Sequence, residues 1–137
     1  MRARLLVLGL TAALVAAFGD DGEAEPPAGG CHEAVDGRVE ITADDLAWDT
    51  DCLRAPAGER LAIVIRNEEE GVNHNLHLPG LPGSPATDLV EGPATQELLL
   101  DPGPAEGTYE YLCDIHPTMV GALEVAGANP EAAGVDR

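Results

Sequence analysis

Four side chains with strong metal-binding chemistry occur at suggestive spacing in this sequence. One segment has the pattern Cys-x2-His-x2-Met, and a further histidine lies well upstream. A thiolate, two imidazoles and a weak axial thioether suit copper in both oxidation states, because the soft sulfurs favour Cu(I) and the imidazoles accept Cu(II). Zinc gains little from a thioether. The pattern predicts one mononuclear copper ion bound by His74, Cys113, His116 and Met119.

The stretch that leads into this segment is typical of a β-strand. Residues 108–113 read Thr-Tyr-Glu-Tyr-Leu-Cys, and a period of two puts both tyrosines and the cysteine on one face. Cys113 is therefore expected at the inner end of a strand. Residues 114–119 are expected to form a short loop before the next strand begins near Gly121.

The rest of the chain shows several more short strands separated by turns rich in glycine and proline. Val39 and Ile41 alternate with polar residues, 61–65 is a β-branched apolar run, and Leu123 and Val125 alternate near the end. No stretch has the pattern of a convincing amphipathic helix. Many short strands without helices predict an all-β fold, an antiparallel Greek-key β-sandwich.

Two segments together resemble the cupredoxins, the small blue type 1 copper proteins, and among them the amicyanin and plastocyanin-like group. Residues 72–77 (Val-Asn-His-Asn-Leu-His) resemble the segment that carries the first ligand of that family, and residues 109–121 resemble its ligand loop. The resemblance extends over roughly Arg38 to Val125. It implies a cupredoxin-like sandwich and a single type 1 copper ion.

The resemblance also implies roles for individual residues around the four ligands. Asn75 corresponds to a residue that ties the two ligand segments together and whose backbone N–H points at the thiolate. Asp114 stands where relatives commonly carry serine or threonine. A carboxylate so close to the sulfur is expected to change the reduction potential, so both residues are candidates for the shell that surrounds the ligands.

The remaining aromatic and imidazole side chains have simpler interpretations. His77 is expected to point away from the face of His74 and not to bind the metal. His32 is expected to be exposed, and Trp48 is expected to be a packing residue rather than an electron relay.

The N-terminus has the features of a secretory signal. Two arginines precede an apolar run that is short for a membrane span and ends in small residues. We therefore expect an exported protein, periplasmic, secreted or at the cell surface; an uncleaved signal acting as a membrane anchor is the alternative. The predicted organisation is a signal peptide (1–17), a flexible acidic tether (18–32), a cupredoxin domain (33–127) and a disordered tail (128–137).

The three cysteines divide into a ligand and a pair. Once Cys113 is assigned to copper, Cys31 and Cys52 remain, and disulfides persist in exported proteins. A Cys31–Cys52 disulfide is therefore predicted, with two free thiols as the alternative.

The charge of the chain limits its partners. The formal net charge is −18, and all seven basic residues are arginines. Nucleic acid is therefore excluded as an expected partner. The acidity favours high solubility or docking onto basic surfaces, so redox proteins with basic docking surfaces are the expected partners of a monomer.

Electron carriage between redox partners is the function that these features favour, and it requires no substrate pocket. Copper delivery or storage with the same ligands is the alternative. An enzyme with Cys113 as nucleophile and His116 as base is a weaker reading, because it leaves Met119 and His74 without a role. We therefore expect no enzymatic activity.

Overall fold

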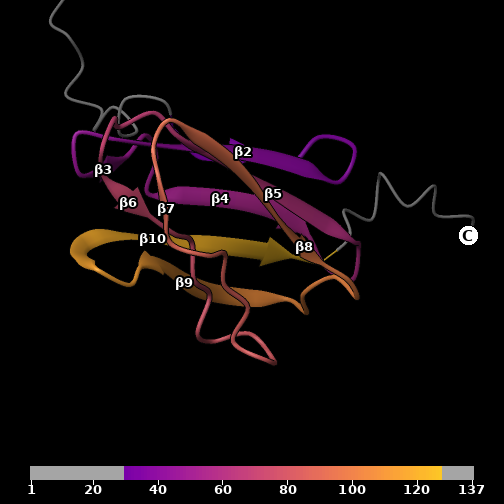
Figure 1. Ribbon diagram of the computed structural model, residues 1–137. Helices are drawn as coiled ribbons and strands as arrows, with labels where there is room; N and C mark the ends of the chain where they lie inside the picture. Colours follow the sequence, from indigo (N-terminus) through magenta and orange to yellow (C-terminus); the bar gives the residue numbers. More distant parts are fainter. Residues whose placement is uncertain (1–29, 128–137) are drawn as a thin grey trace, which may run out of the picture.

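The computed structural model describes residues 30–127, which form ten strands and no helix (Figure 1). Within this range there is accordingly no helix that is long and apolar enough to cross a membrane. The predicted signal peptide, most of the predicted tether and the predicted tail lie outside the described residues.

Two four-stranded sheets and one small two-stranded sheet make up the fold. In spatial order, the first sheet contains β1 (His32–Glu33), β4 (Cys52–Pro56), β10 (His116–Ala126) and β9 (Gly107–Cys113). The second contains β3 (Ala47–Trp48), β2 (Arg38–Asp44), β5 (Leu61–Asn67) and β8 (Ala94–Leu100). The small sheet pairs β6 (Asn73–His74) with β7 (Val90–Glu91).

The predicted all-β sandwich is confirmed, with one refinement of its strand pairing. The pairs β9–β10 and β5–β8 are antiparallel, as expected. The pairs β2–β5, β4–β10 and β1–β4 are parallel, so both large sheets are mixed. Consecutive strands such as β4 and β5 belong to different sheets. When the chain crosses to the other sheet and returns, the new strand can run parallel to an earlier one, as β5 does beside β2.

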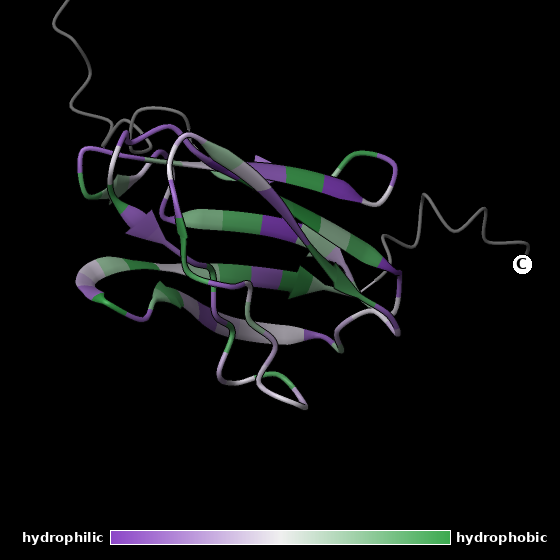
Figure 2. Cartoon of the chain, in the orientation of Figure 1, coloured by the Kyte–Doolittle hydropathy of each residue, from purple (hydrophilic) through white to green (hydrophobic). Residues whose placement is uncertain are grey.

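The core lies between the two large sheets and follows the strand period. Inward positions of β2 and β5, such as Ile41 and Ile63, meet inward positions of β4 and β10, such as Leu53 and Leu123. All four are fully buried. The alternation is visible along the strands in Figure 2. Burying apolar area of this kind stabilises the fold by about 25 cal/mol per Å².

The strand after the predicted ligand loop starts earlier than the sequence suggests. It was expected near Gly121, but β10 begins at His116, which pairs directly with Cys113 across a turn of two residues. The register then shifts between His116 and Val120, and such a bulge accommodates the extra residues without ending the strand. The turn lies at the same end of the sandwich as β3 and β6 (Figure 1).

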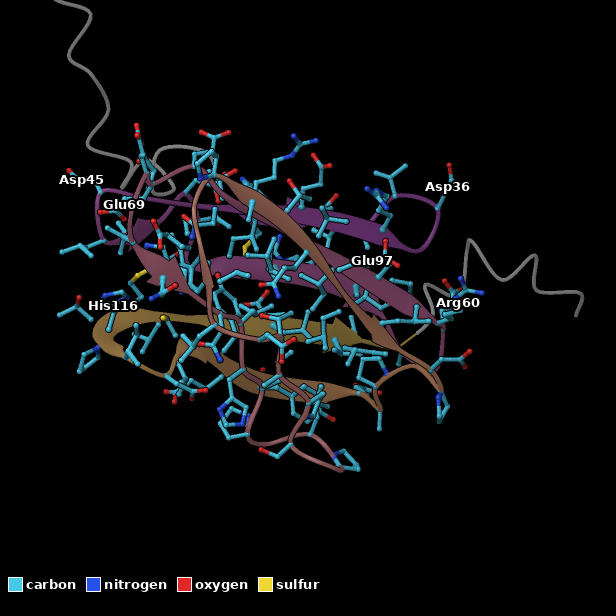
Figure 3. The ribbon with its side chains drawn as sticks, in the orientation of Figure 1. Asp36, Asp45, Arg60, Glu69, Glu97 and His116 are labelled. Atoms are coloured by element: carbon cyan, nitrogen blue, oxygen red, sulfur yellow. A yellow bond between two sulfur atoms is a disulfide. The ribbon has the colours of Figure 1, made fainter. Side chains whose placement is uncertain are left out.

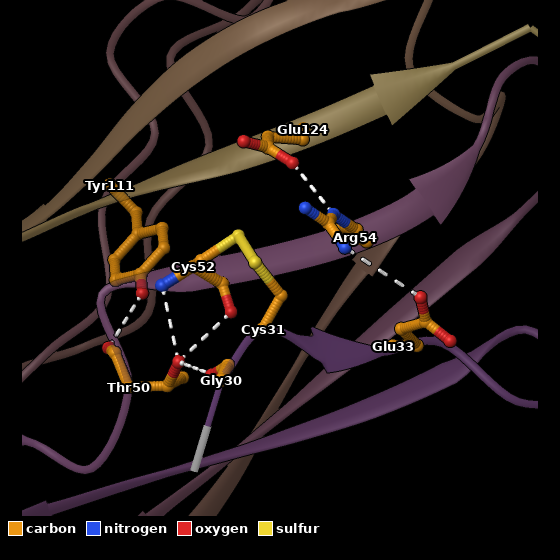
Figure 4. The surroundings of a disulfide bond; sticks show 8 residues. All are labelled: Gly30, Cys31, Glu33, Thr50, Cys52, Arg54, Tyr111 and Glu124. Atoms are coloured by element: carbon orange, nitrogen blue, oxygen red, sulfur yellow. Dashed lines mark hydrogen bonds and ion pairs between the residues drawn. A yellow bond between two sulfur atoms is a disulfide. The ribbon is translucent and has the colours of Figure 1, made fainter. Parts of the chain in front are cut away.

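A disulfide joins Cys31 to Cys52, as predicted, and fixes the start of the described chain to β4 (Figure 4). The hydroxyl of Thr50 donates a hydrogen bond to the carbonyl of Gly30 at 2.7 Å. The hydroxyl of Tyr111 in turn donates to the carbonyl of Thr50 at 2.8 Å. This network anchors the buried Tyr111 ring, which lies two residues before Cys113 on the same face of β9.

The ring of Tyr111 leaves room only for a glycine at position 121. Gly121 pairs with Tyr111 across the β9–β10 ladder, and a Cβ at this position would overlap the ring itself. Because the phenol is fully buried and hydrogen-bonded, it has no free space into which to move. We expect Gly121→Ala to lower the free energy of unfolding by about 1–3 kcal/mol, the usual cost of overpacking, as measured by urea denaturation.

Gly80→Ala is the matched control for this substitution. A Cβ on Gly80 meets its nearest atom, Cδ1 of Tyr109, at an ordinary 3.7 Å. This variant should unfold at nearly the same urea concentration as the parent. Equal stability of the two variants would contradict the assigned role of Gly121.

Candidate metal centre

Three donor atoms from separate strands converge at one end of the sandwich. His74 ends β6, Cys113 ends β9 and His116 begins β10. The Sγ atom of Cys113 lies 3.4 Å from Nδ1 of His116 and 3.9 Å from Nδ1 of His74, and the two Nδ1 atoms are 3.1 Å apart. The antiparallel turn brings the cysteine and one histidine together, and β6 supplies the other.

The spacing of these atoms fits a single bound ion. Donors that each lie about 2.0–2.3 Å from one tetrahedral or trigonal ion are separated from one another by about 3.3–4.0 Å. The separations of 3.4 and 3.9 Å fall within that range, and the separation of 3.1 Å between the two Nδ1 atoms lies just below it. Among the described residues, these three side chains also form a group whose ligand atoms all lie within 4.8 Å of one another.

The site is closed on the protein side and open at one imidazole. His74 and Cys113 are 1% and 2% exposed, whereas His116 is only partly buried. Met119, 1% exposed, packs with Cys113 and Ala43 in a small apolar cluster beside the main core. The fourth predicted ligand therefore packs in one cluster with Cys113, and its thioether is kept from water.

Trp48 packs over this cluster, as expected from the sequence. Its ring lies 6.5 Å from that of His74 and 6.1 Å from that of Tyr111, in an edge-on arrangement with the tyrosine. Its indole N–H is buried and has no hydrogen-bond partner among the described residues. The tryptophan thus acts as an apolar wall that separates the buried imidazole from solvent.

A carboxylate orients the buried histidine. Nε2 of His74 donates a hydrogen bond to Oε2 of Glu69 at 2.8 Å, which leaves the Nδ1 lone pair directed at the cluster. The same Glu69 oxygen accepts the backbone N–H of Leu46 at 3.0 Å. The Leu46 N–H, followed by His74, holds the pKa of the Glu69 carboxyl below its ordinary value of 4.5. Glu69 therefore remains charged and ready to accept.

The two ligand-bearing segments are joined through one amide. Oδ1 of Asn75 accepts the backbone N–H of Asp114 at 2.9 Å, and Nδ2 of Asn75 donates to Oδ2 of Asp114 at 2.7 Å. Asn75 is 2% exposed. Because Asn75 follows His74 and Asp114 follows Cys113, this pair of bonds fixes the imidazole relative to the thiol.

The other histidines lie outside the cluster. Both ring nitrogens of His77 are used elsewhere, Nδ1 with Oδ1 of Asp114 at 2.7 Å and Nε2 with Oγ of Ser84 at 2.6 Å. His32 lies in β1, where its side chain is 29% exposed and Nδ1 donates to the carbonyl of Glu40.

Comparison with known proteins places the chain in a family. No protein-family model matches it. Amicyanin-alpha of Methylorubrum extorquens is 31% identical over 96 residues, which cover 69% of this chain and 76% of that protein. The chain belongs to the cupredoxin family.

Solved cupredoxin structures share this fold. A reduced auracyanin from the photosynthetic bacterium Roseiflexus castenholzii superposes with a TM-score of 0.58 at 22% identity, over 68% of this chain and 99% of that one. A reduced Cu(I) form of an amicyanin variant gives 0.53 at 25% identity, over 68% and 86% of the two chains. The converging donors of this cupredoxin therefore occupy a fold that holds copper in a relative.

Three residues at and around the site were not anticipated from the sequence. Glu69 belongs to an acidic run that looks like a solvated turn, and Ser84 lies in a turn rich in glycine and proline. Asn67 was missed as well, although its buried amide accepts the Glu69 N–H and donates to the carbonyl of Val72 in the same loop and to that of Val90 in β7. An asparagine that ends an apolar strand is the one available signal, because that residue type commonly organises turns.

The depressed pKa of Glu69 predicts how acid affects the copper-free protein. A carboxyl whose pKa is lower in the folded state contributes stability that is present above its unfolded pKa and is lost as the pH falls through the folded value. The advantage of the parent over Glu69→Gln should therefore shrink as the pH falls below 4.5. Urea unfolding of both proteins at several pH values measures this difference in the free energy of unfolding.

Glu68→Gln is the matched control, since Glu68 is exposed in the same loop. Its stability relative to the parent should stay constant over the same pH range. Parallel pH profiles for the parent and Glu69→Gln would show that Glu69 makes no charge-dependent contribution.

Proposed function

We propose that this cupredoxin carries single electrons between redox proteins by means of one type 1 copper ion. The observation that carries the proposal is the convergence of a buried cysteine sulfur with two Nδ1 atoms within 3.9 Å. When bound, copper supplies a one-electron couple between Cu(I) and Cu(II). The ligands in this proposal are His74, Cys113, His116 and Met119.

The protein's own residues prepare this site before any ion binds. Glu69 holds the tautomer of His74, and the Asn75–Asp114 pair holds the two segments in register. Trp48 and Met119 exclude water from the buried side. Donors that are already in position need little rearrangement when the charge of the site changes, and this favours rapid electron transfer.

The partly exposed edge of His116 is the proposed place of electron exit. It is flanked by Ile115, which is 47% exposed, and by the exposed Pro117, and together they form an apolar surface. Small apolar surfaces of this kind suit short-lived encounters. They release the partner quickly once the electron has passed.

Two acidic residues lie at the same end of the sandwich as that edge. Asp45 and Glu69 lie at the end of the sandwich where His116 lies, whereas Arg60 lies at the opposite end (Figure 3). The sequence has no arginine or lysine between Arg66 and Arg137. We propose that the partner presents a basic surface, and that the protein acts as an exported monomer.

Copper delivery or storage is the second candidate, since it would use the same ligands. Delivery requires that the ion leave readily. A site with two buried donors, a buried thioether and an amide that joins its two segments favours retention instead. Electron carriage is therefore the better-supported proposal.

The first test of the proposal is the visible spectrum of the copper-loaded protein. A thiolate bound to Cu(II) should give an intense charge-transfer band that disappears on reduction. Cys113→Ser should abolish the band, because serine offers no thiolate. His77→Gln should retain it, since His77 lies outside the cluster. A colourless loaded protein, or a band that survives in Cys113→Ser, would refute the assignment.

The second test separates carriage from delivery. The reduced, copper-loaded protein is mixed in one experiment with a Cu(I) chelator and in another with an oxidised basic cytochrome, at several salt concentrations. We expect slow loss of copper and fast electron transfer that slows with salt, because the Debye length is only about 8 Å at physiological ionic strength. Rapid loss of copper with slow electron transfer would favour delivery.

A further inference from the structure

A chain of hydrogen bonds runs outward from the candidate ligands to the surface. It starts at Asn75, passes through the carboxylate of Asp114 and the ring of His77, and ends at the hydroxyl of Ser84. Its donor–acceptor distances are 2.7, 2.7 and 2.6 Å. None of these side chains belongs to the proposed ligand set, yet Asp114 directly follows Cys113.

Two donors meet the carboxylate of Asp114. Asn75 donates to one oxygen of Asp114, so Nδ1–H of His77 donates to the other, and a carboxylate with two such donors stays ionised. These two donors, Asn75 before His77, lower the pKa of the Asp114 carboxyl. Nε2 of His77 shares a further hydrogen bond with the hydroxyl of Ser84 at 2.6 Å.

The backbone keeps His77 in place beside the ligand strand. The N–H of His77 donates to the carbonyl of Leu112 at 2.9 Å, and the N–H of Leu112 donates back at 3.0 Å. Leu112 immediately precedes Cys113. The two backbone bonds therefore fix the position of His77 relative to the thiol. From this position the imidazole holds the Asp114 carboxylate in one orientation through its Nδ1 bond.

We propose that Asp114 is the charge that sets the reduction potential of this centre, and that His77, anchored by Ser84, is its positioning residue. This inference rests on the proposed copper function. A negative charge fixed beside Cys113 stabilises the more positive, oxidised state of the site and so lowers the potential. A freely rotating surface carboxylate would be screened by water and salt and would have a smaller effect.

The decisive variant is Asp114→Asn, which removes the charge and keeps an amide oxygen for Asn75. At a fixed applied potential, we expect about a tenfold rise in the ratio of reduced to oxidised protein, or about 59 mV for a one-electron couple. Glu110→Gln is the control, because it removes an equal charge from an exposed position three residues before Cys113. It should shift the ratio much less. Spectroelectrochemistry measures all the variants.

The role of His77 is tested by a double-mutant cycle. His77→Phe should raise the potential by less than Asp114→Asn, because the released carboxylate turns toward solvent. The double variant should have the same potential as Asp114→Asn alone, since His77 acts only through Asp114. Additive shifts would overturn the positioning role. Asp114→Ser supplies a second neutral variant if Asp114→Asn fails to fold.

These outcomes are separate from the failure of the proposed function. If the parent binds copper and shows a visible band and a reversible potential, the function stands. An unchanged or lower potential in both neutral variants at position 114 would then overturn the role of Asp114 alone. Thermal unfolding of the copper-free variants provides an independent readout, because a purely structural role would lower the melting temperature without moving the potential.

Discussion

The paired hydrogen bonds between Asn75 and Asp114 are the constraint on which the rest of the site depends. The candidate copper ligands come from two segments that are far apart in the chain and that belong to different sheets. The β9–β10 turn alone brings Cys113 and His116 together. His74 lies on the short β6, which has only β7 as its ladder partner. The amide of Asn75 joins the residue after His74 directly to the residue after Cys113 and so fixes the imidazole relative to the thiol.

Charged groups at this end of the sandwich are used in pairs with specific donors. Glu69 accepts from His74 and Leu46, and Asp114 accepts from Asn75 and His77. Each carboxylate therefore accepts two fixed N–H groups, which stabilise its charged form. The acidity of the chain is mostly a property of its solvated surface, but these two charges lie against the candidate metal centre and bear directly on its chemistry.

The local patterns of the sequence predicted the parts that short-range rules control. The alternation before Cys113 placed the tyrosines and the cysteine on one buried face, as β9 shows. The strand β8 was missed, because its run Ala-Thr-Gln-Glu-Leu-Leu-Leu mixes exposed and buried positions at an edge of the sheet. The parallel pairs were missed because parallel pairing is decided by long connections rather than by any local pattern.

Contacts between distant side chains explain what else could not be predicted. Glu69 acquires its role only because Asn67 folds its loop back toward His74, and Ser84 acquires its role only because His77 reaches it. The periodicity correctly indicated that His77 points away from His74, but a strand period gives no information about which neighbour the ring meets. Side-chain networks depend on tertiary packing, so no local pattern in the sequence predicts them.

The aspartate at position 114 shows how one such contact requires others. The Asp114 carboxylate follows the ligand cysteine and accepts from a 2%-exposed amide, but its side chain is 41% exposed, so only a further donor fixes its second oxygen. Nδ1–H of His77 is that donor, and the hydroxyl of Ser84 in turn satisfies the far nitrogen of the ring. The three residues therefore form one unit. Replacing any one of them leaves a polar atom of the next without its partner, which ties the chemistry beside Cys113 to a surface turn that holds no ligand.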